Sequence, residues 1–186
     1  MAEKSVRIPK MNHKGGKRGQ KQGGLIQKPT SWVRTSWVLG RKTVACERFA
    51  MRSLVVKYGR LYNGHAVVDA RGLCPSGWHV PSTGEWALLT DHLGGSSAVQ
   101  MKTTYGWVHG GNGTNSGGFS GLPGGFRNQG FGTFAAAGEK GYWWSSTPAS
   151  SSNMYRFRME HQFDYPAISF VPNENGFSVR CVHDTE

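Results

Sequence analysis

Two short segments of the sequence approach known catalytic motifs, and each departs from its motif at a position that the chemistry requires. Residues 118–122 (Gly-Phe-Ser-Gly-Leu) lack the second glycine of a nucleophile elbow, the turn that exposes a reactive serine. Residues 132–140 have the wrong glycine spacing for a phosphate-binding loop and carry Glu139 where that loop has its lysine. Neither segment therefore predicts a catalytic site.

Patterns typical of metal sites do not occur in the sequence. There is no His-Glu-x-x-His and no Cys-x-x-Cys, and the seven histidines are scattered. We interpret His79 as a residue that orients the turn beside Trp78 rather than as a metal ligand. The sequence predicts no catalytic residue, metal or cofactor, and hence a protein that is not an enzyme. A Ser-His-Asp site assembled only in space is the alternative.

Side chains suited to recognition gather near the C-terminus. Tyrosine and arginine combine a large contact area with a polar tip, which favours them in binding sites. We expect these side chains on an outward strand face or in the turns that follow it. The candidate ligand-binding residues are Tyr155, Arg156, Arg158, Glu160, His161, Asp164, Tyr165, Asn173 and Asn175. An ordinary solvated strand face is the alternative interpretation.

Residues 154–160 alternate aromatic or apolar side chains with mostly charged ones. This period of two predicts a strand with its aromatic side chains on one face and its charges on the other. Two more strands are expected, around residues 168–170 and 177–181, with turn-forming residues between them. The three strands together predict an antiparallel meander.

Ser82 and Glu85 have the spacing of a capping box and precede an apolar face, which predicts a helix over about 83–93. Residues 61–70 favour a second, shorter helix. Residues 106–141 contain 13 glycines. Because aromatic side chains interrupt them, this region is expected to be a packed set of long loops rather than a linker.

The 186 residues divide into two parts of different charge. The chain carries a net charge of +11. Residues 1–57 hold 14 Lys/Arg and 2 Asp/Glu, or +12, and residues 58–186 hold 8 and 9, or −1. We therefore predict a basic, partly disordered N-terminal arm over 1–57 and a folded domain over 58–186. No apolar run long enough to span a membrane and no readable signal peptide is found.

Five segments, in this order, resemble the Fibrobacter succinogenes major paralogous domain. They are residues 58–67, 73–95, 118–127, 141–147 and 175–184. The resemblance implies a C-type-lectin-like α+β fold with one or two short helices, a small twisted antiparallel sheet and long glycine-rich loops. It also implies a relation to the formylglycine-generating enzymes and to variable proteins diversified by retroelements.

The chain departs from this family at two places. The opening strand segment of the family has no counterpart in residues 1–57, unless residues 31–57 substitute for it. Gly64 and His65 stand where an aromatic pair is common. Local packing at these two residues is therefore expected to differ.

The resemblance implies that Cys74 and Cys181 form a disulfide, with two buried thiols as the alternative. Cys46 is the odd cysteine and is expected to be a free thiol. The tryptophans in the motifs are expected in the core; they are Trp78, Trp86, Trp143 and Trp144.

Comparison with the relatives also sets expectations about activity. The extra cysteine pair that formylglycine generation needs is missing, so that activity is not expected. Residues 171–174 match a lectin calcium-binding motif only in part, and no calcium site is expected. Residues 153–175 correspond to the segment that varies in retroelement-diversified proteins.

These observations lead to one hypothesis with two alternatives. We expect a non-catalytic recognition module, displayed on a bacterial surface or a phage, that binds a protein or a glycan through its C-terminal strand face and loops. An enzyme of unknown type on the same scaffold is the first alternative. The second is a nucleic-acid-associated protein, because the basic arm, with Trp32 and Trp37, could contact phosphates and stack on bases.

Overall fold

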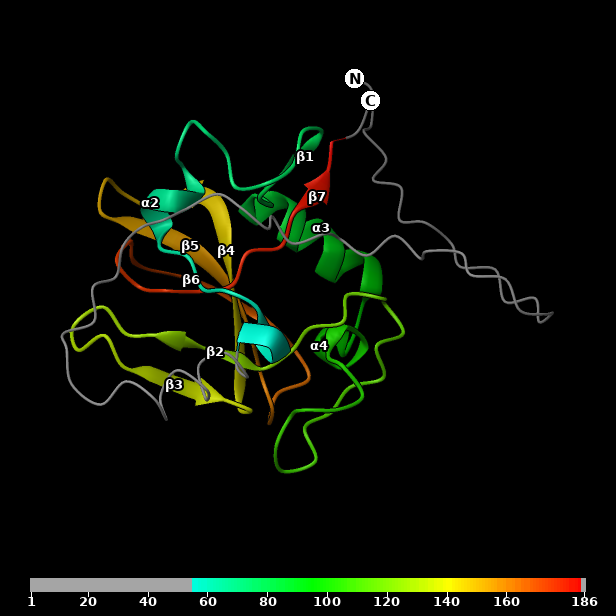
Figure 1. Ribbon diagram of the computed structural model, residues 1–186. Coiled ribbons are helices and arrows are strands. Elements are labelled where there is room, and N and C mark those ends of the chain that lie inside the picture. The colour runs from blue at the N-terminus through cyan, green and yellow to red at the C-terminus, as the bar shows by residue number, and fades with distance from the viewer. Residues whose placement is uncertain (1–54, 185–186) are drawn as a thin grey trace, which may run out of the picture.

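The computed structural model describes residues 55–184 and contains a five-stranded sheet, a two-stranded sheet and short helices (Figure 1). Its elements, in chain order, are α2 (Gly64–Val67), β1 (Trp78–His79), α3 (Thr83–Leu93), α4 (Ser97–Met101), β2 (Gly124–Arg127), β3 (Phe134–Ala137), β4 (Lys140–Pro148), β5 (Asn153–Glu160), β6 (Ala167–Pro172) and β7 (Val182–His183). The class is α+β, as the sequence predicts. The arm expected over 1–57, with Cys46, Trp32 and Trp37, lies almost entirely outside the described residues.

The larger sheet is mixed, which corrects the expectation of a purely antiparallel one. Its strand order is β3-β2-β4-β5-β6, and β2 runs parallel to β4 while the other neighbours are antiparallel. Strands β4, β5 and β6 form the meander. The strand expected at 177–181 does not follow β6 in the meander. Phe177 pairs with Tyr62 and Ser178 with Trp143 of β4, in isolated bridges only. Only Val182 and His183 form a strand, β7, which pairs with β1.

The parallel pairing of β2 with β4 depends on two glycines. Gly125 and Gly141 are the register partners there. A Cβ on Gly141 would collide with the ring of Trp143 and lie 2.8 Å from the carbonyl oxygen of Leu122. Gly125 has a φ of 65° and lies against Ala135, so a side chain fits neither position. Part of the glycine content thus serves close approach of strands.

Helix α3 begins where the sequence places it and covers one face of the large sheet. The Ser82 hydroxyl accepts from the backbone N–H of Glu85, and the Glu85 carboxylate accepts from the Ser82 N–H, which completes the capping box. Trp86 on this helix stacks on Phe157 of β5, with ring centroids 4.3 Å apart. Trp143 of β4 joins the same cluster, so α3 is fixed by aromatic burial against the sheet centre.

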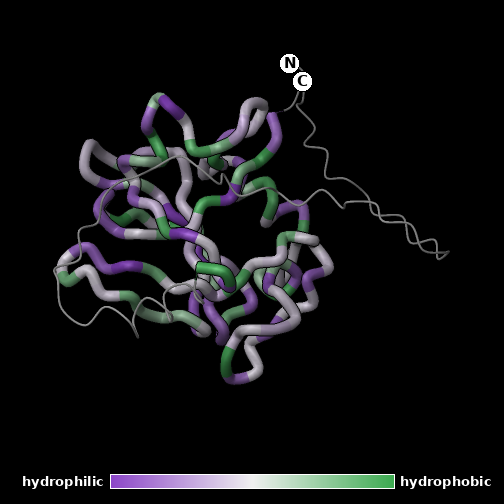
Figure 2. The backbone as a smooth tube through the Cα atoms, in the orientation of Figure 1, coloured by the Kyte–Doolittle hydropathy of each residue, from purple (hydrophilic) through white to green (hydrophobic). Residues whose placement is uncertain are grey.

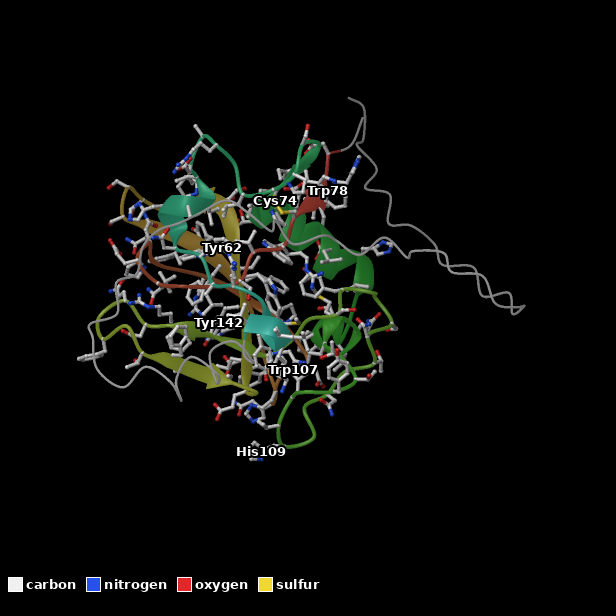
Figure 3. All side chains as sticks on the ribbon, viewed as in Figure 1. Tyr62, Cys74, Trp78, Trp107, His109 and Tyr142 are labelled. Carbon is white, nitrogen blue, oxygen red and sulfur yellow. A yellow bond between two sulfur atoms is a disulfide. The ribbon has the colours of Figure 1, made fainter. Side chains whose placement is uncertain are left out.

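The opposite face of the sheet is covered by α2 and by the segments that flank the disulfide. Trp144 is fully buried there beside Phe177. Cys74 and Cys181 are bonded, with Cα atoms 5.8 Å apart, and the bond is visible beside the label of Cys74 (Figure 3). The predicted disulfide is confirmed. The prediction for Trp78 is wrong, because its side chain is only half-buried on the small β1–β7 sheet.

Two regions differ from the elements that the sequence predicts. Helix α2 is a single turn, capped by the side chain of Asn63, and is shorter than the predicted 61–70. A Cβ on Gly64 would lie 3.1 Å from the Asn173 Cα and from the Met154 sulfur, which explains why glycine stands there. The glycine-rich region contains regular structure as well as loops, since β2 and β3 form a hairpin.

Candidate ligand-binding surface

Strand β5 separates the predicted site residues onto two faces of the sheet. The register places Arg156, Arg158 and Glu160 on the face that carries Tyr142. Tyr155 lies on the opposite face, with Phe157. The predicted residues therefore do not form one continuous surface, and each face is described separately.

The charged face of β5 is covered rather than openly solvated, which corrects the expectation of an outward charged face. The guanidinium of Arg156 lies over the ring of Tyr142, 4.5 Å from its centroid, and 5.3 Å from that of Phe177. Burial lowers the pKa of Arg156, opposed by its hydrogen bond to Tyr142. Phe177 contributes its ring to this face from a segment that lies beside β4, where Ser178 forms a bridge with Trp143. The period-two pattern of β5 does not reveal this long-range contact.

Glu160 ends the charged face as a buried carboxylate that is 5% exposed. Lys140 Nζ lies 2.9 Å from Glu160 Oε2, and Arg158 Nε lies 3.0 Å from Oε1. Lys140 was not predicted as a site residue, because its cross-strand partner is decided by the register of β4 and β5. Glu160 is thus a shared partner for two cations and does not project into solvent.

Asn173 and Asn175 lie in the turn after β6, one of the places the sequence predicts for them, but both are buried. Their side-chain amides donate to the backbone carbonyls of Ser151 and Pro172, respectively. Both residues therefore hold the turn after β6 in place. Gln129 adds a further contact, because its backbone N–H donates to the Asn175 side chain.

The turn between β5 and β6 is held by the buried side chain of Lys102, a residue that the sequence analysis did not identify. This lysine is 2% exposed, and its ammonium donates to the carbonyl of Phe163 at 2.8 Å. Burial lowers the pKa of Lys102, while Asp164 opposes that shift. His161 is half-buried against His109. Asp164 and Tyr165 remain exposed on the turn, as predicted.

A partly exposed apolar strip lies on the other face of the same hairpin. We define it as Tyr155, Ile168 and Phe170. Phe170 is 60% and Ile168 39% exposed, and the rings of Tyr155 and Phe170 meet edge to face at 5.9 Å. The strip adjoins the core, because Ile168 is the register partner of Phe157. Tyr165, which is 64% exposed, precedes it in the turn.

His79 joins two carboxylates at the other end of the molecule. Its Nδ1 lies 2.5 Å from Asp184 Oδ1, and its Nε2 lies 2.7 Å from Glu85 Oε1. The sequence predicts that His79 orients the turn beside Trp78. In the structure, His79 links β1 both to the segment after β7 and to the start of α3. Partial burial lowers the pKa of His79, but the two hydrogen bonds and the attraction of both carboxylates outweigh it and raise that pKa.

The sign of the His79 shift sets the pH window in which this link stabilises the fold. A raised pKa in the folded state stabilises the protein fully below the ordinary value of 6.5, and the contribution disappears as pH rises through the folded-state pKa. Burial raises the pKa of Glu85, yet hydrogen bonds from Ser82 and His79 lower it overall. The Glu85 contribution is therefore present above 4.5 and is lost as the medium becomes more acidic.

Within residues 55–184, no three His, Cys, Asp or Glu side chains are grouped so as to hold a metal ion. No helix in this part of the chain is both long and apolar enough to cross a membrane. Hydrophobic and hydrophilic residues alternate at short intervals along the chain (Figure 2).

The fold and this surface define a disulfide-linked α+β domain with a two-faced C-terminal hairpin. Residues 22–183 match the sequence profile of the Fibrobacter succinogenes major domain. Because the match covers most of the 186 residues, the chain belongs to that family. It includes residues 22–54, which precede the described part. No curated protein and no solved structure matches the chain.

Proposed function

We propose that the domain is a non-catalytic recognition module and that the apolar strip of the β5–β6 hairpin binds a protein ligand. The observation that carries the proposal is the exposure of Ile168 and Phe170 beside a cluster of buried aromatic side chains. Exposed apolar side chains that adjoin one another on a fixed scaffold are typical of interaction sites. Tyr165 extends the exposed aromatic area toward the turn.

A protein ligand is favoured over a glycan by the backbone of β6. This strand is an edge of the large sheet, and its outer side pairs with no other strand of the described part. Its sequence, Ala-Ile-Ser-Phe-Val-Pro, carries no charge to deter pairing. An extended segment of a partner can therefore add to this edge through main-chain hydrogen bonds while its side chains contact the strip.

The proposal has two further parts, one on the location of the module and one on its fold and diversification. The disulfide supports an oxidising location, such as the outside of a bacterial cell or a phage particle. We also propose that the domain is a branch of the C-type-lectin-like fold and a diversified variable protein. Its support is the resemblance of the five motifs and the position of the hairpin within residues 153–175.

An array of purified surface proteins and glycans, probed with the full chain, tests the proposal. We expect saturable binding to a protein that is lost in the Phe170→Ser and Tyr165→Ala variants. Tyr105→Ala is the matched control, because Tyr105 is equally exposed but lies outside the hairpin. Each variant is first checked for an unchanged melting temperature. Binding to glycans alone, or equal loss in the Tyr105 control, would refute the proposal.

A further inference from the structure

The charged face of β5 carries more positive than negative charge. Arg156, Arg158 and Lys140 lie at neighbouring register positions of β4 and β5. Among the described acidic residues, only Glu160 lies within ion-pair distance of any of the three. Two of the three cations, Lys140 and Arg158, share this carboxylate, and with Arg156 the local net charge is about +2 under partial burial.

Several donors on this face make no hydrogen bond in the described part of the chain. They are the Nε atoms of Arg156 and Arg158 and the hydroxyl of Ser169, and all three atoms are buried. Ser169 is the register partner of Arg156, so these donors belong to one patch. Arg158 Nε is close to Glu160 but is not aligned for a hydrogen bond. Buried donors without a partner cost free energy unless an acceptor meets them.

The patch is also within reach of solvent. The side chains of Arg158 and Lys140 are each 31% exposed, so a small group can approach them. The ring of Tyr142 holds the Arg156 guanidinium in one orientation. Guanidinium groups held in place in this way suit oxyanions, which accept two parallel hydrogen bonds from them.

We propose that Arg156, Arg158 and Ser169 form a binding site for an oxyanion, such as a carboxylate or sulfate group on a ligand, with Lys140 adding positive charge at the Glu160 end of the patch. The site lies on the face of β5 opposite the apolar strip. A test of anion binding is therefore independent of a test of the proposed protein contact. Glu160 competes with the bound anion for Lys140 and Arg158 and thereby limits its affinity.

Nuclear magnetic resonance of the arginine Nε–H groups in the full chain tests this site. Sodium sulfate and sodium acetate are titrated separately at constant ionic strength, with sodium chloride as the balancing salt. We expect the Nε–H signals of Arg156 and Arg158 to shift and saturate with at least one of the two, which also separates tetrahedral from planar oxyanions. The signal of Arg71, an exposed residue paired with Asp69, should not saturate. Saturation with neither anion, or equal shifts at Arg71, would overturn the proposal.

Variants give a second, independent measurement. Arg158→Gln should weaken the effective anion affinity at least about tenfold, since it removes a charged hydrogen-bond donor. Arg71→Gln should leave the affinity unchanged. Glu160→Gln should tighten binding, because it removes the competing carboxylate. If Glu160→Gln does not fold, the contrast between Arg158→Gln and Arg71→Gln decides alone, and equal affinity in these two variants would contradict the site.

Discussion

The Cys74–Cys181 disulfide is expected to supply a large share of the stability of this domain. It joins residues separated by 107 positions and therefore closes almost the whole folded part. In the chain-entropy description, a loop of that length removes about 16 cal/mol/K from the unfolded ensemble, which is about 4.8 kcal/mol at 25 °C. Domains of this size are usually stable by only about 5–15 kcal/mol, so loss of the bond should leave a marginal fold.

The disulfide lies beside the small β1–β7 sheet, which has only two residues in each strand. Without the bond, the C-terminal segment is held by this short pairing, by the His79 link and by the burial of Phe177. The cost should therefore include some local loosening near β7. Hydrogen exchange at the Val182 amide would report that local contribution separately from global unfolding.

Urea unfolding of Cys74→Ala/Cys181→Ala measures the effect, with both the variant and its reference carrying Cys46→Ala to prevent thiol exchange. We expect the free energy of unfolding to fall by about 4–5 kcal/mol. The urea dependence of that free energy should become steeper, because an unfolded chain without the cross-link exposes more surface. A loss below about 1 kcal/mol with an unchanged slope would refute the loop-entropy argument.

Three other predictions follow from local geometry and from the family. From pH 6 to pH 8.5, the free energy of unfolding should decrease less in His79→Gln than in the native chain. His92→Gln is the control. Equal pH profiles for His79→Gln and the native chain, or an equally flattened profile for His92→Gln, would argue against the carboxylate link. Gly141→Ala should destabilise the fold by about 2–3 kcal/mol in thermal melts, whereas Gly95→Ala, whose Cβ would meet nothing within 4 Å, should be nearly neutral; similar melting temperatures would contradict the close approach of β2 and β4. Aligned sibling copies from one genome should differ most within residues 153–175, and uniform substitution along the chain would remove the diversification proposal.

Local patterns in the sequence were enough to predict the elements that depend on near neighbours. Helix α3 follows from Ser82 and Glu85, because a capping box is formed by residues three positions apart. Strands β5 and β6 follow from period-two alternation in the same way. The disulfide came from the family resemblance rather than from any local rule, since its two cysteines are distant in sequence.

The candidate site shows what local patterns leave undecided. Alternation in β5 indicates that its two faces differ, but it does not say what covers each face. The charged face is partly covered by Phe177, and the aromatic face leaves Phe170 and Ile168 in solvent at the sheet edge. The roles of Lys140 and Lys102 became apparent only from strand register and from a long-range hydrogen bond, respectively.

The sequence alone therefore determined the family, the class of fold, the capped helix and the alternating strands, since each is encoded by residue type and short spacing or by a motif. Tertiary structure decided which side chains meet. The parallel pairing of β2 with β4 and the bridges of residues 176–178 to Arg127, Tyr62 and Trp143 are long-range contacts that no local pattern specifies. Those contacts, and not the pattern within any one strand, bring Lys140 and Arg158 to Glu160 and leave Ile168 and Phe170 exposed at the free edge of β6.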